Sequence, residues 1–214
     1  MSYAVKEIFL TLQGEGMQAG RRAVFLRFSG CNLWTGREQD RASADCTFCD
    51  TDFVGMDGEN GGRYADAAAL ADRVADLWST GIAEAGGRPF VVMTGGEPLL
   101  QVDDALIAAL HERGFEIAVE TNGTIAAPAG IDWICVSPKA GTEIVQRSGD
   151  ELKLVWPQPG NDYRAMEGWD FAHFLVSPMD GPDLAGTTAA AVAFVIAHPR
   201  WRLSTQTHKA IGIQ

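Results

Sequence analysis

The sequence predicts an α/β protein built on an incomplete parallel β/α barrel with reduced helix content. Short apolar runs typical of buried strands recur along the chain, and polar or glycine-rich residues follow several of them at the carboxyl end. These runs outnumber the convincing amphipathic helices. Because β/α barrels gather functional side chains at the carboxyl ends of their strands, we expect the active site on that rim.

Two strands are expected at the beginning of the chain. Val5–Leu12 forms the first and leads into residues 13–16, where two glycines either make a simple turn or let the backbone approach a ligand. Ala23–Phe28 forms the second, and Arg27 lies within it. A charge in an apolar strand either pairs with a structural carboxylate or receives an anionic ligand, and the sequence leaves both possibilities open.

A polar region follows the second strand. Asn32–Asp45 is rich in charges and predicts a short helix or surface loop, and the glycines of Met56–Gly62 predict another loop. A helix begins after Asp66, which is a suitable N-cap. We expect its buried face to contain Leu70, Val74, Leu77 and Trp78.

The apolar run Pro89–Thr94 is the clearest buried parallel strand. It ends in the Gly-Gly-Glu-Pro sequence at residues 95–98, where the glycines make room for a ligand. A helix containing Leu106 and Leu110 follows and ends at Gly114.

Further strands are expected along the second half of the chain, with polar residues after three of them. The strands are Glu116–Thr121, Trp133–Val136, Leu152–Val155, Phe174–Val176 and Leu203–Gln206. An alanine-rich helix is predicted over Thr187–His198, before Pro199. Residues 207–214 are expected to be too short to form an element and apolar enough to pack inward.

Composition limits the class of protein. The 214 residues contain 46% hydrophobic residues, which is enough for one core, so we expect a single domain over residues 1–214. The net charge of −11 and the lack of a basic cluster argue against nucleic-acid binding and favour a small-molecule substrate. With no signal-peptide pattern and no apolar run that could span a bilayer, we expect no membrane association, a cytoplasmic location and reduced thiols.

Three cysteines form a candidate metal site. A Cys-x-x-Cys motif joins Cys46 to Cys49, and Cys31 precedes it. Thiolates bind zinc or iron–sulfur centres, and three of them leave one coordination position open for chemistry. Cys135 could complete a structural zinc site, but its place in an apolar strand favours buried packing.

The Cys-x-x-Cys motif with an earlier cysteine, together with the strand ending in Gly-Gly-Glu-Pro, resembles the radical S-adenosylmethionine superfamily. The resemblance extends over most of the chain and implies a partial barrel of that superfamily's type. It also implies a [4Fe-4S] cluster on Cys31, Cys46 and Cys49, whose open iron chelates S-adenosylmethionine. The combination of motifs disfavours zinc.

Fourteen residues separate Cys31 from Cys46, whereas the superfamily's common spacing is Cys-x3-Cys. With the loop at residues 12–16, the short chain and the Gln-Thr-His-Lys sequence at 206–209, this spacing is similar to the family of 7-carboxy-7-deazaguanine synthases. The resemblance implies a carbon–nitrogen lyase that contracts 6-carboxy-5,6,7,8-tetrahydropterin to 7-carboxy-7-deazaguanine with loss of ammonia, in queuosine or other 7-deazapurine biosynthesis. It further implies Mg2+, a homodimer and an electron donor such as flavodoxin.

The same resemblance assigns residues to each ligand. Substrate contacts are expected from Leu12, Gln13, Gly14, Arg27, Thr94 and Gln214. S-adenosylmethionine contacts are expected from Phe48, Gly96, Ser137, Pro138, Lys139, Ser177, Pro178, Met179 and Asp180. Thr51 is the implied Mg2+ ligand, although a threonine that caps a turn is an alternative. Surface salt bridges are an alternative for Lys139 and Asp180.

The expectation for Gln214 concerns its α-carboxylate. That group is ionised at neutral pH, and its two oxygens can accept the paired N–H donors of a pterin. Other function classes also remain: an activase that uses the same cofactor to place a glycyl radical on a partner protein, and a zinc-stabilised binding module.

Overall fold

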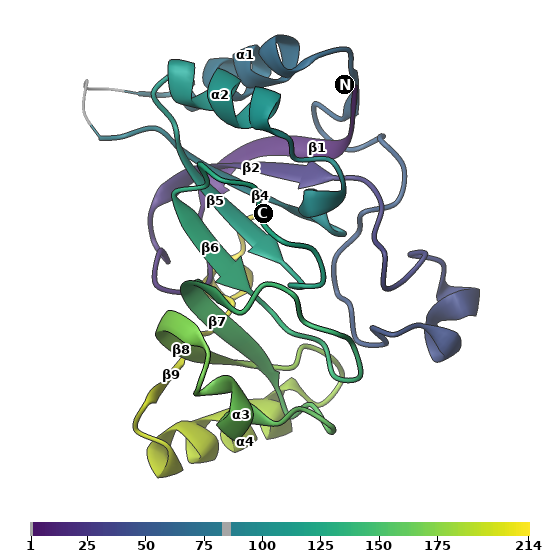
Figure 1. Ribbon diagram of the computed structural model, residues 1–214, viewed down its shortest axis with the longest axis vertical. Helices are drawn as coiled ribbons and strands as arrows, with labels where there is room; N and C mark the ends of the chain where they lie inside the picture. The colour runs from purple at the N-terminus through teal and green to yellow at the C-terminus, as the bar shows by residue number, and fades with distance from the viewer. Residues whose placement is uncertain (1, 83–86) are drawn as a thin grey trace.

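The computed structural model describes residues 2–82 and 87–214; the predicted domain, residues 1–214, includes five residues outside this description. A twisted sheet forms the centre of the molecule, with strand order β3-β1-β2-β4-β5-β6-β7-β8-β9 (Figure 1). The strands are β1 Tyr3–Leu12, β2 Arg22–Phe28, β3 Gly62–Tyr64, β4 Phe90–Gly95, β5 Glu116–Thr121, β6 Trp133–Val136, β7 Ser148–Trp156, β8 Asp170–Pro178 and β9 Trp201–Leu203.

The sheet confirms the predicted partial parallel barrel. Each neighbouring pair from β2 through β9 is parallel. At the other edge, β1 pairs antiparallel with both β2 and β3. The parallel strands therefore bring their carboxyl ends to a common rim, as expected for a barrel-type site.

Helices cover the two ends of the sheet and leave its middle uncovered (Figure 1). Helices α1 (Ala67–Trp78) and α2 (Asp104–Glu112) pack together over the end that contains β1, β2 and β5. Helix α4 (Leu184–Ala197) packs on β7, β8 and β9. The connections from β5 to β6 and from β6 to β7 contain no helix, which confirms the reduced helix content.

Local sequence explains where the principal helices begin. The carboxylates of Asp66 and Asp103 each accept a hydrogen bond from a backbone N–H in the first turn, at 2.9 and 3.0 Å. Gly114 ends α2 with φ +79°, in the left-handed region that favours glycine. The expected face of α1 is only partly in the core: Leu70 and Val74 are fully buried, and Leu77 and Trp78 are half-buried.

Several boundaries differ from the sequence prediction. Strands β7 and β8 extend well before their apolar runs because backbone pairing between them continues through polar residues. The last strand ends at Leu203, where the prediction placed its beginning. No sequence pattern indicated β3 or two short helices, η2 (Pro98–Leu100) and α3 (Tyr163–Met166). Within Asn32–Asp45, where the sequence predicts a short helix or a surface loop, the structure has the short helix η1 (Glu38–Ser43).

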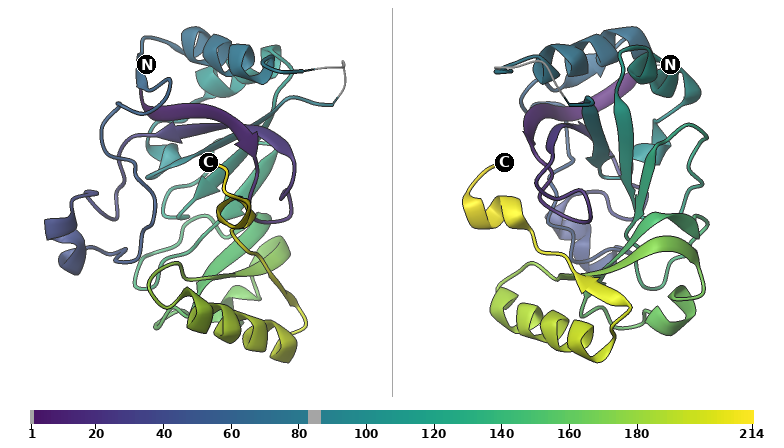
Figure 2. Two further views of the ribbon diagram at one scale, coloured as in Figure 1. Left: turned by 180° about the vertical axis from the view of Figure 1, so that it is seen from behind. Right: turned by 90° about the vertical axis from the view of Figure 1, so that its left-hand side faces the viewer.

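The prediction for the last eight residues was wrong. Thr207–Ile211 forms a short helix, α5, and the segment is mostly exposed, including Ile211 and Ile213. Polar contacts hold it: the Thr207 N–H donates to the carbonyl of Gly14 at 3.0 Å. Figure 2 shows the segment (yellow) running from β9 across to β1 (purple).

No helix in the described ranges is both long and apolar enough to cross a bilayer.

Candidate active site

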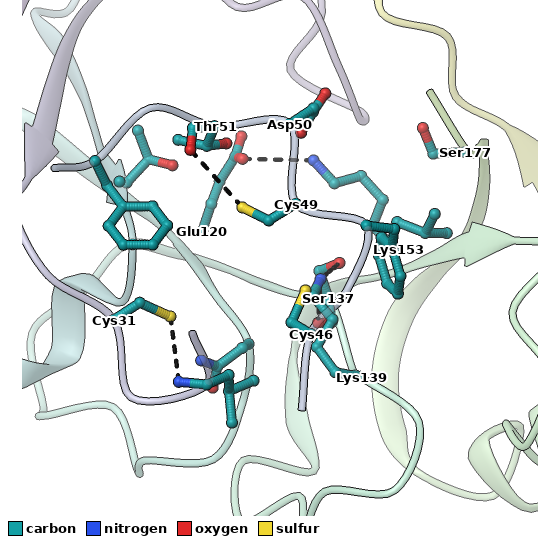
Figure 3. A pocket seen from close by; sticks show the side chains of 18 of the residues that line it. Cys31, Cys46, Cys49, Asp50, Thr51, Glu120, Ser137, Lys139, Lys153 and Ser177 are labelled. Carbon is teal, nitrogen blue, oxygen red and sulfur yellow. Dashed lines mark hydrogen bonds and ion pairs between the residues drawn. The ribbon is translucent and has the colours of Figure 1, made fainter. Parts of the chain in front are cut away.

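A pocket opens at the carboxyl ends of β4 to β8, beneath the loop that carries the cysteines (Figure 3). Cys31, Cys46 and Cys49 all line it, and all are free thiols. Cys135 lies in β6, is 4% exposed and does not line the pocket. The structure therefore brings together the three predicted cluster ligands and separates the fourth cysteine from them.

The long insertion between the first two cysteines folds back onto the Cys-x-x-Cys motif. Arg41 donates hydrogen bonds to the carbonyls of Thr47 and Cys49, both at 3.1 Å. Its guanidinium also lies over the Trp34 ring, 4.0 Å from the centroid. Arg41 thus fixes the backbone of the motif, a role that its place in a charged stretch did not indicate.

The thiols suit a cluster better than a single ion. Among the described residues, no three His, Cys, Asp or Glu side chains converge where one metal ion could be held. Each thiolate of a four-iron cluster binds a different iron, so its ligands need not converge. A hydrogen bond from Cys46 lowers the pKa of Cys49 to about 6 and raises the pKa of Cys46. This set of soft donors fits a [4Fe-4S] cluster with one iron left open.

The Gly-Gly-Glu-Pro turn at the end of β4 needs both of its glycines. Gly95 has φ +122°, and a Cβ on Gly96 would lie 2.0 Å from the carbonyl oxygen of Gly30. Glu97 is fully buried and accepts hydrogen bonds from the backbone N–H of Leu99 at 2.9 Å and of Asn122 at 2.8 Å. Burial raises its pKa. The turn is therefore held against β2 and β5 by close backbone contact.

Seven of the nine residues expected to bind S-adenosylmethionine line this pocket. They are Phe48, Gly96, Ser137, Lys139, Ser177, Pro178 and Asp180. The ammonium of Lys139 donates to the Ser137 hydroxyl at 2.7 Å and lies 5.6 Å from the centroid of the Phe48 ring. Burial lowers the pKa of Lys139. Lys139 makes none of the salt bridges found among the described residues, so that alternative does not hold for it.

Two expected contacts do not reach the pocket surface. Pro138 is buried and its carbonyl accepts a hydrogen bond from Gln158. Met179 is half-buried and its backbone N–H bonds to the carbonyl of Trp156. Both lie at the carboxyl ends of strands, and the residues on either side of each line the pocket.

A second, more polar pocket adjoins the first. Its lining includes the expected substrate contacts Leu12, Gln13, Arg27, Thr94 and Gln214. Six residues line both pockets: Glu15, Asp50, Thr51, Thr94, Glu120 and Gln206. Gly14 lines neither, because it packs against the ring of His208, which would meet a Cβ on Gly14 at 2.0 Å.

Arg27 pairs with a structural carboxylate, which was one of its two predicted roles, and it is still placed where it could receive an anionic ligand. Its Nε donates to the Glu7 carboxylate at 2.7 Å, so it has a structural partner. Its side chain is 19% exposed and still borders the second pocket. The ion pair orients the guanidinium without enclosing it.

A charged group forms the wall between the pockets, and the sequence analysis missed it. Lys153 Nζ lies 2.6 Å from Glu15 Oε2. It also lies 3.5 Å from Glu120 Oε2, and Figure 3 labels Lys153 and Glu120. Burial would lower the pKa of Lys153, but the two carboxylates outweigh it and the pKa is raised. Burial would raise the pKa of Glu15, but Lys153 holds it below its usual range. A lysine inside the apolar run of β7 was the available signal.

The C-terminal segment closes one side of both pockets. Lys209 Nζ bridges Asp50 Oδ2 at 2.7 Å and Asp180 Oδ2 at 2.6 Å. For Asp180 the predicted alternative of a salt bridge is therefore realised. The Thr11 hydroxyl donates to the main-chain oxygen of Gln214 at 2.7 Å, which holds this residue at the second pocket.

Comparison with known proteins agrees with this geometry. Residues 39–151 match the model of the Radical SAM superfamily. Along its whole length the chain is 64% identical to the 7-carboxy-7-deazaguanine synthases of Bradyrhizobium diazoefficiens and of Caulobacter vibrioides, each of which it covers completely. The crystal structure of QueE from Escherichia coli superposes with a TM-score of 0.70 at 25% identity, over 97% of this chain and 95% of that one. The chain therefore belongs to the 7-carboxy-7-deazaguanine synthase family of the radical S-adenosylmethionine superfamily.

Proposed function

We propose that this enzyme converts 6-carboxy-5,6,7,8-tetrahydropterin to 7-carboxy-7-deazaguanine with release of ammonia, in the biosynthesis of queuosine or another 7-deazapurine. The observation that carries the proposal is the pair of adjoining pockets, one lined by three thiols and the other by polar groups suited to a heterocycle. Membership of the family favours this activity over the protein activase and the zinc-stabilised module.

The first pocket, which contains the three thiols and is called the cofactor pocket below, is the proposed site of the cluster and S-adenosylmethionine. Cys31, Cys46 and Cys49 would hold the cluster, which with S-adenosylmethionine supplies the radical that removes hydrogen from substrate C6. The backbone of residues 95–97 would receive the methionyl end of S-adenosylmethionine, because Gly95 and Gly96 line this pocket and have no side chain to cover their backbone groups. Phe48 offers an aromatic face, and Ser137, Lys139, Ser177 and Asp180 offer polar contacts. Pro138 and Met179 would act by shaping these loops.

The second pocket, called the substrate pocket below, is the proposed substrate site. The Arg27 guanidinium would pair with the substrate carboxylate, because its fork of N–H donors matches the two oxygens. Leu12, Gln13, Thr94 and Gln214 would surround the pterin, and Gly14 would fix the loop through its contact with His208. These residues hold C6 toward the shared wall, and placement of the reacting atom is the protein's main contribution to the rate.

Mg2+ is proposed at Thr51, which borders both pockets. A hard cation prefers oxygen ligands, and one hydroxyl alone binds it weakly. The substrate's own oxygens would complete the shell. Substrate and Mg2+ are therefore expected to bind together, each increasing the affinity for the other.

We also propose a cytoplasmic homodimer that receives electrons from a donor such as flavodoxin. The four free cysteines agree with a reducing compartment. Helix α4 presents the exposed apolar side chains Leu184, Val192 and Ile196, and such a patch suits a second copy of the chain. Ile196→Glu should then shift the mass measured in solution from dimer to monomer, whereas a mass unchanged by that substitution would exclude this face as the interface.

The decisive experiment is mass spectrometry of the reaction products. Anaerobic protein with reconstituted cluster, S-adenosylmethionine, reductant, Mg2+ and the pterin should release 7-carboxy-7-deazaguanine and ammonia. Reductive cleavage of S-adenosylmethionine without ammonia release would keep the cofactor class and reject the ring contraction.

A further inference from the structure

We infer that Lys153 is a positioning residue for substrate recognition: it holds Glu15 and Glu120 as a fixed pair of hydrogen-bond acceptors on the wall of the substrate pocket. This inference rests on the proposed function and names the group that would recognise the N–H donors of the substrate ring.

The ammonium group of Lys153 lies on the cofactor side of the wall, whereas the two carboxylates that it holds reach the substrate side. Its side chain is 7% exposed and lines the cofactor pocket, and it is absent from the lining of the substrate pocket. Glu15 and Glu120 line both pockets and are 16% and 25% exposed. The carboxylates therefore reach the substrate side, and the ammonium supports them from the cofactor side.

Amide groups fix the other oxygen of each carboxylate. Gln206 Nε2 donates to Glu15 Oε1 at 3.0 Å, and Gln13 Nε2 donates to Glu120 Oε1 at 2.9 Å. Each carboxylate thus has one oxygen on Lys153 and one on a glutamine. An ionised carboxylate has about four acceptor sites, so unused sites remain on both groups. The remaining acceptors match a ligand edge rich in N–H groups.

The other charged groups near Lys153 explain why its charge matters. Glu151 on β7, Cys135 on β6 and Lys139 after β6 also face it, and Asp50 lies near Glu15. Without the Lys153 ammonium, Glu15 and Glu120 would be two like charges on one wall. Glu15, whose pKa Lys153 holds down, would then take up a proton more readily, and an O–H donor would replace an acceptor.

Glu151 provides a matched control. It is a buried carboxylate beside the same lysine, but its oxygens accept from the Met17 N–H at 2.8 Å and from the Trp133 indole. It lines neither pocket. Glu151→Gln removes a neighbouring charge and leaves the proposed acceptor pair in place.

The test is equilibrium binding of 6-carboxytetrahydropterin and of S-adenosylmethionine to cluster-loaded protein, from about pH 6 to pH 9. Lys153→Met should weaken pterin binding by about 10- to 100-fold near pH 6. The affinity should recover as the pH rises and the Glu15 carboxyl ionises. Binding of S-adenosylmethionine should barely change. Lys153→Arg should restore most of the pterin affinity, and Glu151→Gln should follow the wild-type pH profile.

Iron content and thermal melting show whether each variant is folded. If Lys153→Met does not fold, Glu15→Gln and Glu120→Gln take its place, and each should weaken pterin binding at every pH without recovery. Unchanged pterin affinity in the folded variants, or equal loss for both ligands, would overturn the inference. A wild-type protein that binds no pterin would instead reject the proposed function.

Discussion

The two pockets share a wall but are held by different forces. The cofactor pocket depends on backbone contact: the glycine turn packs against β2, and Glu97 binds backbone N–H groups on both sides of it. The substrate pocket depends on side-chain ion pairs, namely Arg27 with Glu7 and Lys153 with Glu15 and Glu120. The difference implies that added bulk damages the first pocket, whereas altered charge damages the second.

The largest effect is expected from Cys31→Ala, which tests whether the cofactor pocket extends to a residue outside the matched Radical SAM range. Iron content and turnover should both be lost, since two thiolates do not hold a cluster that needs three. Cys135→Ala is the control and should keep its iron, because Cys135 is buried in β6. Loss of iron in the control alone would assign the third ligand to Cys135.

Gly96→Ala tests the backbone character of the cofactor pocket. Its Cβ would lie 2.0 Å from the Gly30 oxygen, so the free energy of unfolding should fall by about 3 kcal/mol, as for strong overpacking. Affinity for S-adenosylmethionine should fall as well. In Gly114→Ala, the matched control, nothing would lie within 4 Å of the new Cβ, and only the cost of a positive φ, about 1 to 2 kcal/mol, should appear.

Arg27→Lys tests the electrostatic character of the substrate pocket. Lysine keeps the charge but lacks the planar fork in which Nε binds Glu7 and the terminal N–H groups stay available for a substrate carboxylate. Substrate binding should weaken by about 2 kcal/mol in a titration, with S-adenosylmethionine affinity unchanged. An equal loss for both ligands would assign Arg27 to the scaffold that the pockets share.

The smallest effect is expected at the edge of the substrate pocket, where Lys6 Nζ in β1 lies 2.9 Å from the exposed Asp52. The hydrogen bond from Lys6 lowers the pKa of Asp52. Its stabilisation is therefore present above the unfolded-state pKa of about 3.9 and disappears as the pH falls through the lower folded-state value.

Lys6→Met should consequently reduce the free energy of unfolding at pH 7 only slightly, because both partner carboxylates, Asp52 and Asp57, are exposed to solvent. The difference in free energy of unfolding between the wild-type and Lys6→Met apoproteins, measured by denaturant titration, should be smaller at pH 3 than at pH 7. A difference that grows on acidification would contradict the assigned ion pair.

Much of the fold could be predicted from local sequence. Strands β5 and β6 have the predicted bounds, and α1 begins at the predicted cap, Asp66. These elements depend on apolar runs and capping residues that are close in sequence. The C-terminal segment could not be predicted in this way, because the partners that fix α5 are distant in sequence: Gly14 and Asp50 come from the first quarter of the chain, and Asp180 comes from the end of β8.

The candidate site likewise contains parts that short sequence motifs indicated and parts that depend on residues distant in sequence. The cysteines and the glycine turn were recognisable because a cluster demands thiolates and a close backbone approach demands glycine, and two of the cysteines and the turn each form a short motif. The wall of Lys153, Glu15 and Glu120 combines residues from a loop and from two strands. Glu15 and Glu120 are 105 residues apart along the chain, and Glu120 and Lys153 are 33 residues apart. Local sequence specifies strands and motifs through short-range propensity. Pairing of buried charges depends on distances that exist only after the sheet has formed, so the folded chain alone establishes which carboxylates meet which lysine.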